Sequence, residues 1–302
     1  MKKKYKLIEC AGTDLFRVVA LRDFGSIKAG DEGGLIASES NLSHGGDCWV
    51  YGDAVVSGNA VIYEDAKVCD DAAVSGSAKV YGDAMVYDNA KVYDGAEVYE
   101  DAQVYDGAEV YEDACIFVNA TVSGDAEVFG NAQVFGDARV YDGAEVYEDA
   151  EVFGNATVSG NATVSGDAQV YGDAQVCDDA GVYDDAMVSG NAVVNGNAAV
   201  YGDARVYGDA EVCDNAKVYD DAMVSGNAVV NGNAEVFGNA QVCDNDWILQ
   251  QIPGDAEVRG DAEEKASDSK AETFDFSILP DNVESIKIDG KTYKKVSTWV
   301  EA

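Results

Sequence analysis

Alanine recurs at every sixth position of this chain from Ala54 to Ala240, without exception. Two residues after each of these alanines stands a valine, which is replaced only at Ile62 and Ile116. With few exceptions the unit is Val-(Tyr/Ser/Phe/Cys)-(Gly/Asp/Glu)-(Asp/Asn/Gly)-Ala-x, and we number its positions 1 to 6 from the valine. Units this short cannot bury an apolar face alone, so they must coil and stack on one another.

Each unit has the pattern of a short strand followed by a turn. The valine and its two neighbours alternate as in a β-strand of about three residues, with the valine on one face and the neighbours on the other. The Gly-Asp, Gly-Asn or Asp-Gly pair that follows favours a turn, because these residues tolerate positive φ. The sequence therefore predicts an all-β solenoid.

Longer duplications indicate the size of one coil. The residues AMVSGNAVVNGNA run from Ala186 to Ala198 and return at Ala222 to Ala234, 36 residues later. The residues AEVYEDA at Ala108 return at Ala144, again 36 residues later. If three units make a coil of about 18 residues, this interval is two whole coils, and every outward side chain keeps its column.

The pattern resembles the hexapeptide-repeat, left-handed parallel β-helix family, whose motif has an aliphatic residue at position 1 and a small one at position 5. The chain departs from that family at position 2, which is usually small or acidic there and is Tyr, Phe or Ser here. The segment 20–46, ALRDFGSIKAGDEGGLIASESNLSHGG, and the segment 49–60, WVYGDAVVSGNA, also resemble the YdcK-type β-solenoid family of enterobacteria and phages. These resemblances imply a triangular, left-handed parallel β-helix of about eleven coils.

Four regions are expected along the chain. They are an N-terminal cap at 1–41, the solenoid at 42–245, an irregular last coil at 246–262, and a linker with a small C-terminal β tail at 263–302. The cap would close a strand edge that stacked coils otherwise leave open. The tail would hold a hairpin that turns at Asp289-Gly290, as a second cap or a docking module.

One outward column of the predicted solenoid is aromatic. Its members, each one predicted coil after the last, are Tyr63, Tyr81, Tyr99, Phe117, Phe135, Phe153 and Tyr171. Coils about 4.8 Å apart would stack these rings as a ladder. The ladder would stabilise neighbouring coils, and it would also form an apolar stripe of the kind that marks an interface. Packing side by side into a homotrimer or dimer would use that stripe.

A second column is acidic and lies at the corners. It comprises Asp149, Asp167, Asp185, Asp203 and Asp221, flanked in alternate coils by Glu148, Asp184 and Asp220. Such a ridge is either a row of solvated turn residues or a binding surface. A Ca²⁺ ion could bridge its oxygen atoms, but the Gly-Gly-x-Gly-x-Asp spacing of calcium-binding β-rolls is absent from the sequence. We therefore expect no metal and no other cofactor.

Charge is concentrated in the predicted solenoid. Residues 42–245 contain 38 acidic and 6 basic side chains, a net charge of −32, out of −37 for the whole chain. Over a solenoid about 53 Å long, this is about one negative charge per 1.7 Å, which is near the charge density of duplex DNA. The charge would keep the protein soluble, or it would mimic DNA towards a DNA-binding host protein. Direct binding of nucleic acid is disfavoured, because the only basic cluster is the short run of lysines at the N-terminus.

Catalysis is not indicated by the sequence. The hexapeptide-repeat acyltransferases, which the resemblance brings in as an alternative, usually carry a histidine general base on a loop that protrudes from a coil. The single histidine here, His44, precedes the regular units, and no loop interrupts them. A Ser-His-Asp or Cys-His arrangement would need the same residue. We expect a structural role for His44 and no enzymatic activity.

The seven cysteines form no C-x-x-C pair, so they indicate neither a zinc site nor a disulfide framework. No stretch approaches the roughly 20 apolar residues of a membrane span, so we expect a cytoplasmic protein that makes no contact with membranes. Its function would be that of an oligomeric scaffold, or of a binding or sequestering protein. The alternatives are a DNA mimic that inhibits a host protein and an acyltransferase.

Overall fold

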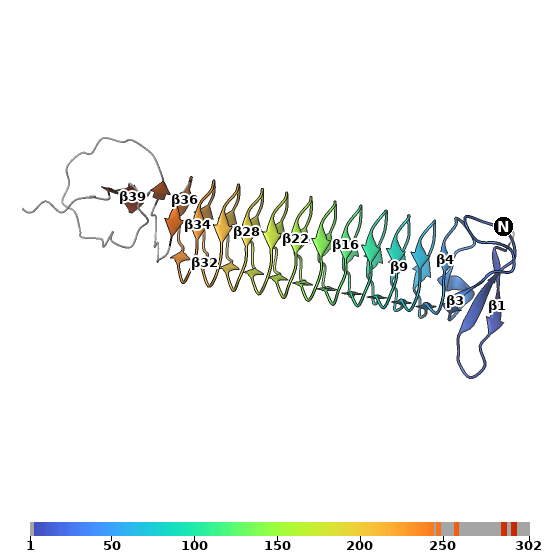
Figure 1. Cartoon of the computed structure of the whole chain (residues 1–302). Coiled ribbons are helices and arrows are strands. Elements are labelled where there is room, and N and C mark those ends of the chain that lie inside the picture. The colour runs from blue at the N-terminus through green and yellow to red at the C-terminus, as the bar shows by residue number, and fades with distance from the viewer. Residues whose placement is uncertain (1–2, 245, 249–256, 260–284, 289–290, 295–302) are drawn as a thin grey trace, which may run out of the picture. The chain divides into compact units, whose positions relative to one another are not determined.

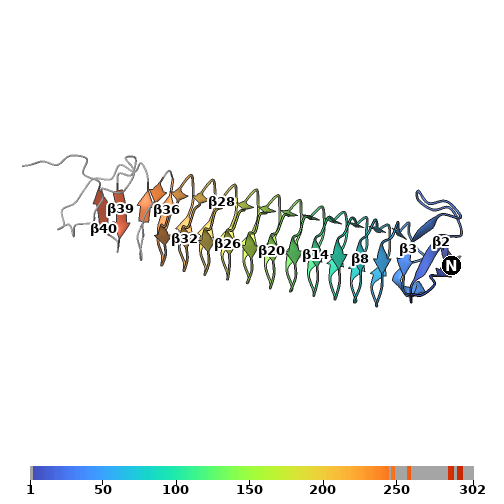
Figure 2. The same cartoon turned by 60° about the horizontal axis from the view of Figure 1, so that its bottom comes forward.

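The computed structural model describes residues 3–244, 246–248, 257–259, 285–288 and 291–294. It divides into two compact units, Met1–Asn161 and Ala162–Ala302, which we call unit one and unit two. In both units, each coil adds one short strand to each of three sheets (Figures 1 and 2). We call these the first, second and third sheets.

Unit one begins with the cap. Its elements are β1 (Tyr5–Glu9), β2 (Phe16–Ala20), β3 (Glu32–Ile36) and the 3₁₀-helix η1 (Glu39–Asn41). Strands β1, β2 and β3 pair antiparallel in that order, and β3 then pairs in parallel with β5 (Val55–Val56) of the first sheet. The cap thus supplies the first three strands of that sheet.

Two glycines allow β3 to lie close to the coil below it. A Cβ atom at Gly33 would come within 2.5 Å of the Val50 carbonyl oxygen. A Cβ atom at Gly34 would come within 2.6 Å of the Ala54 carbonyl oxygen. Since real Cβ atoms do not approach oxygen so closely, any larger residue would push the cap away from the coil.

The coils of unit one are made of two-residue strands. In the first sheet, β5 is followed by β8 (Ala73–Val74), β11 (Lys91–Val92), β14 (Glu109–Val110), β17 (Glu127–Val128) and β20 (Glu145–Val146). The second sheet has β4 (Trp49–Val50), β7 (Lys67–Val68), β10 (Met85–Val86), β13 (Gln103–Val104), β16 (Thr121–Val122), β19 (Arg139–Val140) and β22 (Thr157–Val158). The third sheet has β6 (Val61–Ile62), β9 (Lys79–Val80), β12 (Glu97–Val98), β15 (Cys115–Ile116), β18 (Gln133–Val134) and β21 (Glu151–Val152).

Unit two continues the same pattern within itself. Its first sheet has β23 (Thr163–Val164), β26 (Gly181–Val182), β29 (Ala199–Val200), β32 (Lys217–Val218) and β35 (Glu235–Val236). Its second sheet has β25 (Gln175–Val176), β28 (Val193–Val194), β31 (Glu211–Val212), β34 (Val229–Val230) and β37 (Trp247–Ile248). Its third sheet has β24 (Gln169–Val170), β27 (Met187–Val188), β30 (Arg205–Val206), β33 (Met223–Val224) and β36 (Gln241–Cys243).

Three further strands extend the third sheet of unit two. They are β38 (Glu257–Arg259), β39 (Ser285–Ile288) and β40 (Lys291–Lys294). Strand β38 pairs in parallel with β36, and β39 pairs antiparallel with both β38 and β40. The predicted turn at Asp289-Gly290 and the predicted linker EEKASDSKAE at 263–272 lie outside the described residues.

Partner strands lie one coil apart along the chain. Val86, for example, pairs in parallel with Val68 on one side and with Val104 on the other. The predicted all-β parallel solenoid with about 18 residues per coil is therefore confirmed. It has about twelve coils rather than eleven, because β3 of the cap already belongs to the stack.

The valines and alanines of the units form the core. From Ala54 to Val242, the side chains at positions 1 and 5 are at most 1% exposed. Strands have two residues rather than the predicted three, because the chain turns directly after position 2. The residue at position 3 takes up the left-handed conformation there, as at Gly82 with φ 70° and Asp88 with φ 57°.

Candidate interaction surfaces

The aromatic column predicted on one face lies on the third sheet. In unit one, the rings of Tyr63, Tyr81, Tyr99, Phe117, Phe135 and Phe153 stack in succession, with centroids 4.7 to 4.9 Å apart and planes within 10° of parallel. Tyr171, the last predicted member, belongs to unit two. The rings sit at position 2 and are half-buried. Coils spaced as a parallel sheet bring such rings to stacking distance.

A second ladder, which we did not predict, lies on the first sheet. In unit one it consists of Tyr93, Tyr111, Phe129 and Tyr147, with centroids 4.8 to 5.0 Å apart. In unit two, Tyr201, Tyr219 and Phe237 stack in the same way, with centroids 4.9 to 5.1 Å apart. The same spacing of one coil would have revealed both sets in the sequence.

Several of the tyrosine hydroxyls donate hydrogen bonds to glutamates on the adjacent coil. The Tyr81 hydroxyl donates to Glu97 at 3.1 Å, and the Lys79 ammonium binds the other oxygen of that carboxylate at 2.6 Å. Tyr93, Glu109 and Lys91 repeat this arrangement on the first sheet, at 2.9 and 2.6 Å. These groups tie each ring to the next coil, so they contribute to the stack itself.

The electrostatics of these groups follow from their contacts. Burial raises the pKa of the Tyr81 hydroxyl, and its hydrogen bond to the Glu97 carboxylate raises this pKa further. The hydrogen bond from the Lys91 ammonium lowers the pKa of Glu109. The tyrosines of both ladders are therefore neutral phenols near neutral pH, and the Glu109 carboxylate is ionised there.

The predicted acidic ridge is divided between the two units. In unit one, Asp149 accepts a hydrogen bond from the Asn131 amide at 2.9 Å. In unit two, Asp167, Asp185, Asp203 and Asp221 occupy position 4 of four consecutive coils and are exposed. The side chains of these four residues make no hydrogen bond or ion pair within the described part of unit two. They are solvated carboxylates, about 4.8 Å apart along the corner.

The flanking carboxylates at position 3 behave differently. The Asp184 carboxylate accepts the backbone amide of Gly202 at 3.1 Å, and that of Asp220 accepts the amide of Gly238 at 3.1 Å. The sequence did not indicate this role, because it depends on which backbone amides the ladder leaves without a carbonyl partner. In unit two, Asp184 and Asp220 at position 3 are thus structural carboxylates, whereas the ridge residues at position 4 are solvated.

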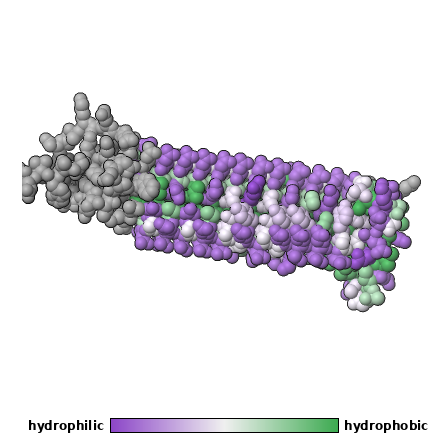
Figure 3. All heavy atoms as spheres, in the orientation of Figure 1, coloured by the Kyte–Doolittle hydropathy of each residue, from purple (hydrophilic) through white to green (hydrophobic). Residues whose placement is uncertain are grey.

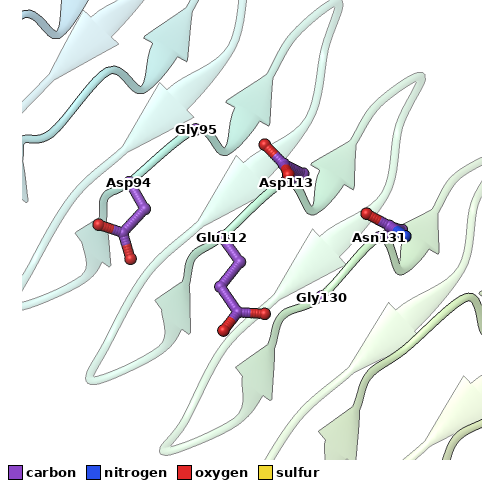
Figure 4. A pocket seen from close by; sticks show the side chains of 6 residues that line it. All are labelled: Asp94, Gly95, Glu112, Asp113, Gly130 and Asn131. Carbon is purple, nitrogen blue, oxygen red and sulfur yellow. The ribbon is translucent and has the colours of Figure 1, made fainter.

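The corner that bears Asp149 also bears an open hollow of about 430 Å³ in unit one. It is lined by Asp94, Gly95, Glu112, Asp113, Gly130 and Asn131 (Figure 4). Carboxylates of neighbouring coils flank the hollow, and the residues that line it include neither a histidine nor a cysteine. Among the described residues, no group of three or more His, Cys, Asp or Glu side chains could hold a metal ion. The hollow is a continuation of the acidic corner.

His44 lies within the cap and is held on both sides of its ring. The Lys4 backbone amide donates to Nδ1 at 3.2 Å, and Nε2 lies 2.8 Å from the Glu39 carboxylate. The hydrogen bonds from Lys3 and His44 lower the pKa of Glu39. The ring also packs on Tyr5, with centroids 4.3 Å apart. These contacts join β1 to the segment that follows η1.

Hydropathy differs between the corners and the faces of the coils. In Figure 3 the exposed corner residues form purple rows, and paler and green side chains lie between these rows. The view is consistent with acidic residues at positions 3 and 4 and with aromatic residues at many of the positions 2. The faces, rather than the corners, are the surfaces suited to apolar contact.

Comparison with known proteins concerns the repeats. The family model described as YdcK Beta solenoid repeat matches residues 132–148, 150–166, 156–172 and 216–232. The chain matches none of the curated proteins with which it was compared. Among the described residues, no helix has the length and hydropathy that crossing a membrane requires.

Proposed function

We propose that this YdcK-type β-solenoid protein acts without catalysis, as an acidic scaffold that self-associates through its aromatic third sheet. The observation that carries the proposal is the uninterrupted ladder of six rings on one face of unit one. Rings that stack on each other turn their edges outwards and form a flat stripe. A stripe of this kind suits contact with another flat surface better than it suits capture of a small molecule.

The surroundings of His44 support the absence of catalysis. Both ring nitrogens are engaged, one by the Lys4 amide and the other by Glu39. A general base needs one nitrogen directed at a substrate proton. The hollow at the acidic corner contains carboxylates and an amide but no nucleophile with an adjacent base.

We further place the protein in the cytoplasm. All seven cysteines are free thiols, and six of them are half-buried while Cys48 is buried. Thiols that persist in the reduced form are typical of a reducing compartment. The partner in assembly would be a second copy of the chain, as a dimer or a trimer.

Sedimentation velocity of the full chain over a range of concentrations tests the scaffold. We expect the weight-average sedimentation coefficient to rise with concentration. Changing Phe117, Phe135 and Phe153 together to Ser should abolish the rise while the β signal in circular dichroism remains. The matched control makes the same change to Ser at Tyr93, Tyr111 and Phe129, an equal number of stacked rings on the first sheet. This variant should still associate as the concentration rises.

A second function, mimicry of DNA, is favoured by the solvated ridge of unit two. Asp167, Asp185, Asp203 and Asp221 repeat at a spacing of about 4.8 Å, and within the part of unit two that the structure describes none of them forms an ion pair. A row of exposed negative charges can compete with phosphates for a basic surface on a host protein. An acyltransferase, the third candidate, has no comparable support.

A further inference from the structure

The third sheet of unit one changes its chemistry halfway along the ladder. The first three rings, Tyr63, Tyr81 and Tyr99, have hydroxyl groups at their tips, and the next three, Phe117, Phe135 and Phe153, do not. The ladder itself continues unbroken across this change, with 4.9 Å between the centroids of Tyr99 and Phe117. Stacking alone therefore does not account for the change from tyrosine to phenylalanine.

Charge changes at the same point. In the three coils with tyrosines, seven of the twelve residues at positions 6, 2, 3 and 4 are charged, namely Glu64, Asp65, Lys79, Asp83, Glu97, Glu100 and Asp101. In the three coils with phenylalanines, only Asp137 and Glu151 are charged. Loss of charge around aromatic side chains is typical of the centre of a protein–protein interface.

Val118 adds a third anomaly at the edge of this region. From Gly52 to Asp244, position 3 is Gly, Asp or Glu in every unit except this one. Val118 has φ 62°, in the left-handed region that β-branched residues avoid. The fold thus carries backbone strain to keep an apolar side chain next to Phe117. Such strain persists where the surroundings or a function require it.

We propose that Cys115, Phe117, Val118, Phe135 and Phe153 form the contact surface for a second copy of this chain, and we call them the phenylalanine patch. This inference rests on the proposed self-association and assigns its contact residues. The spacing of the rings, 4.8 to 4.9 Å, argues for a second copy. Only a surface with the same repeat can match it coil for coil, and another solenoid face has that repeat.

The distribution of charge also favours a second copy of the chain as the partner of the phenylalanine patch. Two chains of net charge −37 repel each other over most of their surface. Within the third sheet of unit one, this repulsion is weakest at the phenylalanine patch, because position 3 there has Val118, Gly136 and Gly154 whereas the tyrosine coils have the carboxylates of Glu64 and Glu100. Of the contacts that this face of unit one could make with its own copy, contact between two patches therefore brings the fewest like charges together.

The size of the surface predicts weak association. If the contact extends from the patch along the whole third sheet of unit one, it covers six coils, or about 29 Å, and a face about five residues wide is about 16 Å across. This gives roughly 460 Å² per partner, compared with about 800 Å² in a stable interface. We expect a dimer that forms at high micromolar concentration and dissociates on dilution.

The test adds charge to the patch with residues that other coils already have at the same positions. In the patch variant, Val118→Asp is combined with Gln133→Glu. In the control variant, Gln103→Glu is combined with Gln175→Glu, which adds the same two charges to exposed sites on the second sheet. Sedimentation equilibrium of the full chains, from about 5 to 500 μM, gives the dissociation constants.

We expect the patch variant to weaken self-association at least about tenfold, and the control variant less than about threefold. The melting temperature of the patch variant should not fall, because Asp tolerates the left-handed conformation. Equal weakening by the two variants, or association unaffected by the patch variant, would overturn the assignment of the patch and leave the scaffold standing. A wild-type chain that is monomeric at 500 μM would contradict both proposals.

Discussion

The carboxylate of Asp184 accepts the backbone amide of Gly202, one coil further along, at 3.1 Å. The pairs Asp178 with Gly196 and Asp214 with Gly232 repeat this contact at another corner of unit two, at 3.2 and 3.3 Å. A carboxylate in one coil and a glycine in the next form a unit of two coils. Two coils contain 36 residues, which is the interval of the longest duplications in the sequence.

This pairing predicts unequal effects of substitution at its two members. Gly202→Ala should destabilise the fold by about 1–2 kcal/mol, because a side chain at φ 70° is strained and its Cβ would lie 2.9 Å from the Asp220 amide nitrogen. Asp184→Gly keeps the backbone conformation and should cost less than about 1 kcal/mol, since water can replace the exposed acceptor. Chemical denaturation of both variants gives the comparison, and a larger loss for Asp184→Gly would refute the explanation.

Relief of strain at Val118 should stabilise the protein. Asn is tolerated in the left-handed conformation, so Val118→Asn should raise the free energy of unfolding by about 1 kcal/mol. The measurement is the thermal midpoint by circular dichroism. Val122→Asn, at a buried core position, is the opposite control and should lower it. A lower midpoint for Val118→Asn would show that the valine is not strained.

Because position 1 faces the core and position 2 faces outwards, substitutions at these two positions should differ sharply in how much they destabilise the fold. Val140→Asp places a carboxylate in a core where Val140 is 0% exposed, so it should cost several kcal/mol and collapse the coil. Tyr201→Ser removes one half-buried ring that stacks on Tyr219, and we expect a loss of about 1 kcal/mol. Thermal unfolding followed at a β-sheet wavelength measures both. Comparable losses would contradict the assignment of the two positions.

High pH should weaken the ladders. Burial raises the pKa of Tyr81, Tyr93 and Tyr111, and hydrogen bonds to glutamates raise it further. A group whose pKa is raised in the folded state stabilises the fold below its unfolded pKa, here 10.0, and loses that contribution as pH rises above it. In a titration to high pH, the absorbance of tyrosinate should therefore appear at a higher pH in the folded protein than in the unfolded chain. Simultaneous titration of all tyrosines near pH 10 in the folded protein would count against the ladders.

Mimicry of DNA predicts that the acidic ridge binds a partner protein in a salt-dependent way, whereas a role of the charge in solubility alone predicts no such binding. Changing Asp149, Asp167, Asp185, Asp203 and Asp221 together to Asn removes five charges and keeps the turn chemistry. If the chain mimics DNA, proteins that bind it at about 50 mM salt should no longer bind at about 200 mM salt or when duplex DNA is added. They should also fail to bind this variant. The control is Asp184→Asn, which retains the ridge. Partners that are indifferent to all three conditions would leave the scaffold as the only function.

The sequence predicted the solenoid well because its period is a property of the backbone. Side chains at positions 1 and 5 must face inwards in every coil, and the one-coil spacing of Tyr63 and Tyr81 then follows. Side-chain contacts were harder to predict. A Cβ at Gly181 would collide with the Tyr183 ring, so that ring bends over the glycine, a detail that the repeat pattern does not contain. The burial of Lys4 was also not predictable from the repeat pattern. Its side chain is fully buried and its ammonium group donates to three backbone carbonyls, an arrangement that depends on the cap as a whole.

The central claim, that the third sheet is covered by a second copy, is tested most directly by the reactivity of Cys115. Its thiol is half-buried beside Phe117 on the third sheet, whereas Cys69 and Cys177 are half-buried on the second. Burial raises the pKa of all three thiols, and each thiol serves as its own reference as the protein concentration changes. The rate of alkylation at each cysteine, measured by mass spectrometry as the protein concentration rises, separates the two sheets. Our account predicts that alkylation of Cys115 slows with concentration while Cys69 and Cys177 react at constant rates. A rate at Cys115 that is independent of concentration would contradict it.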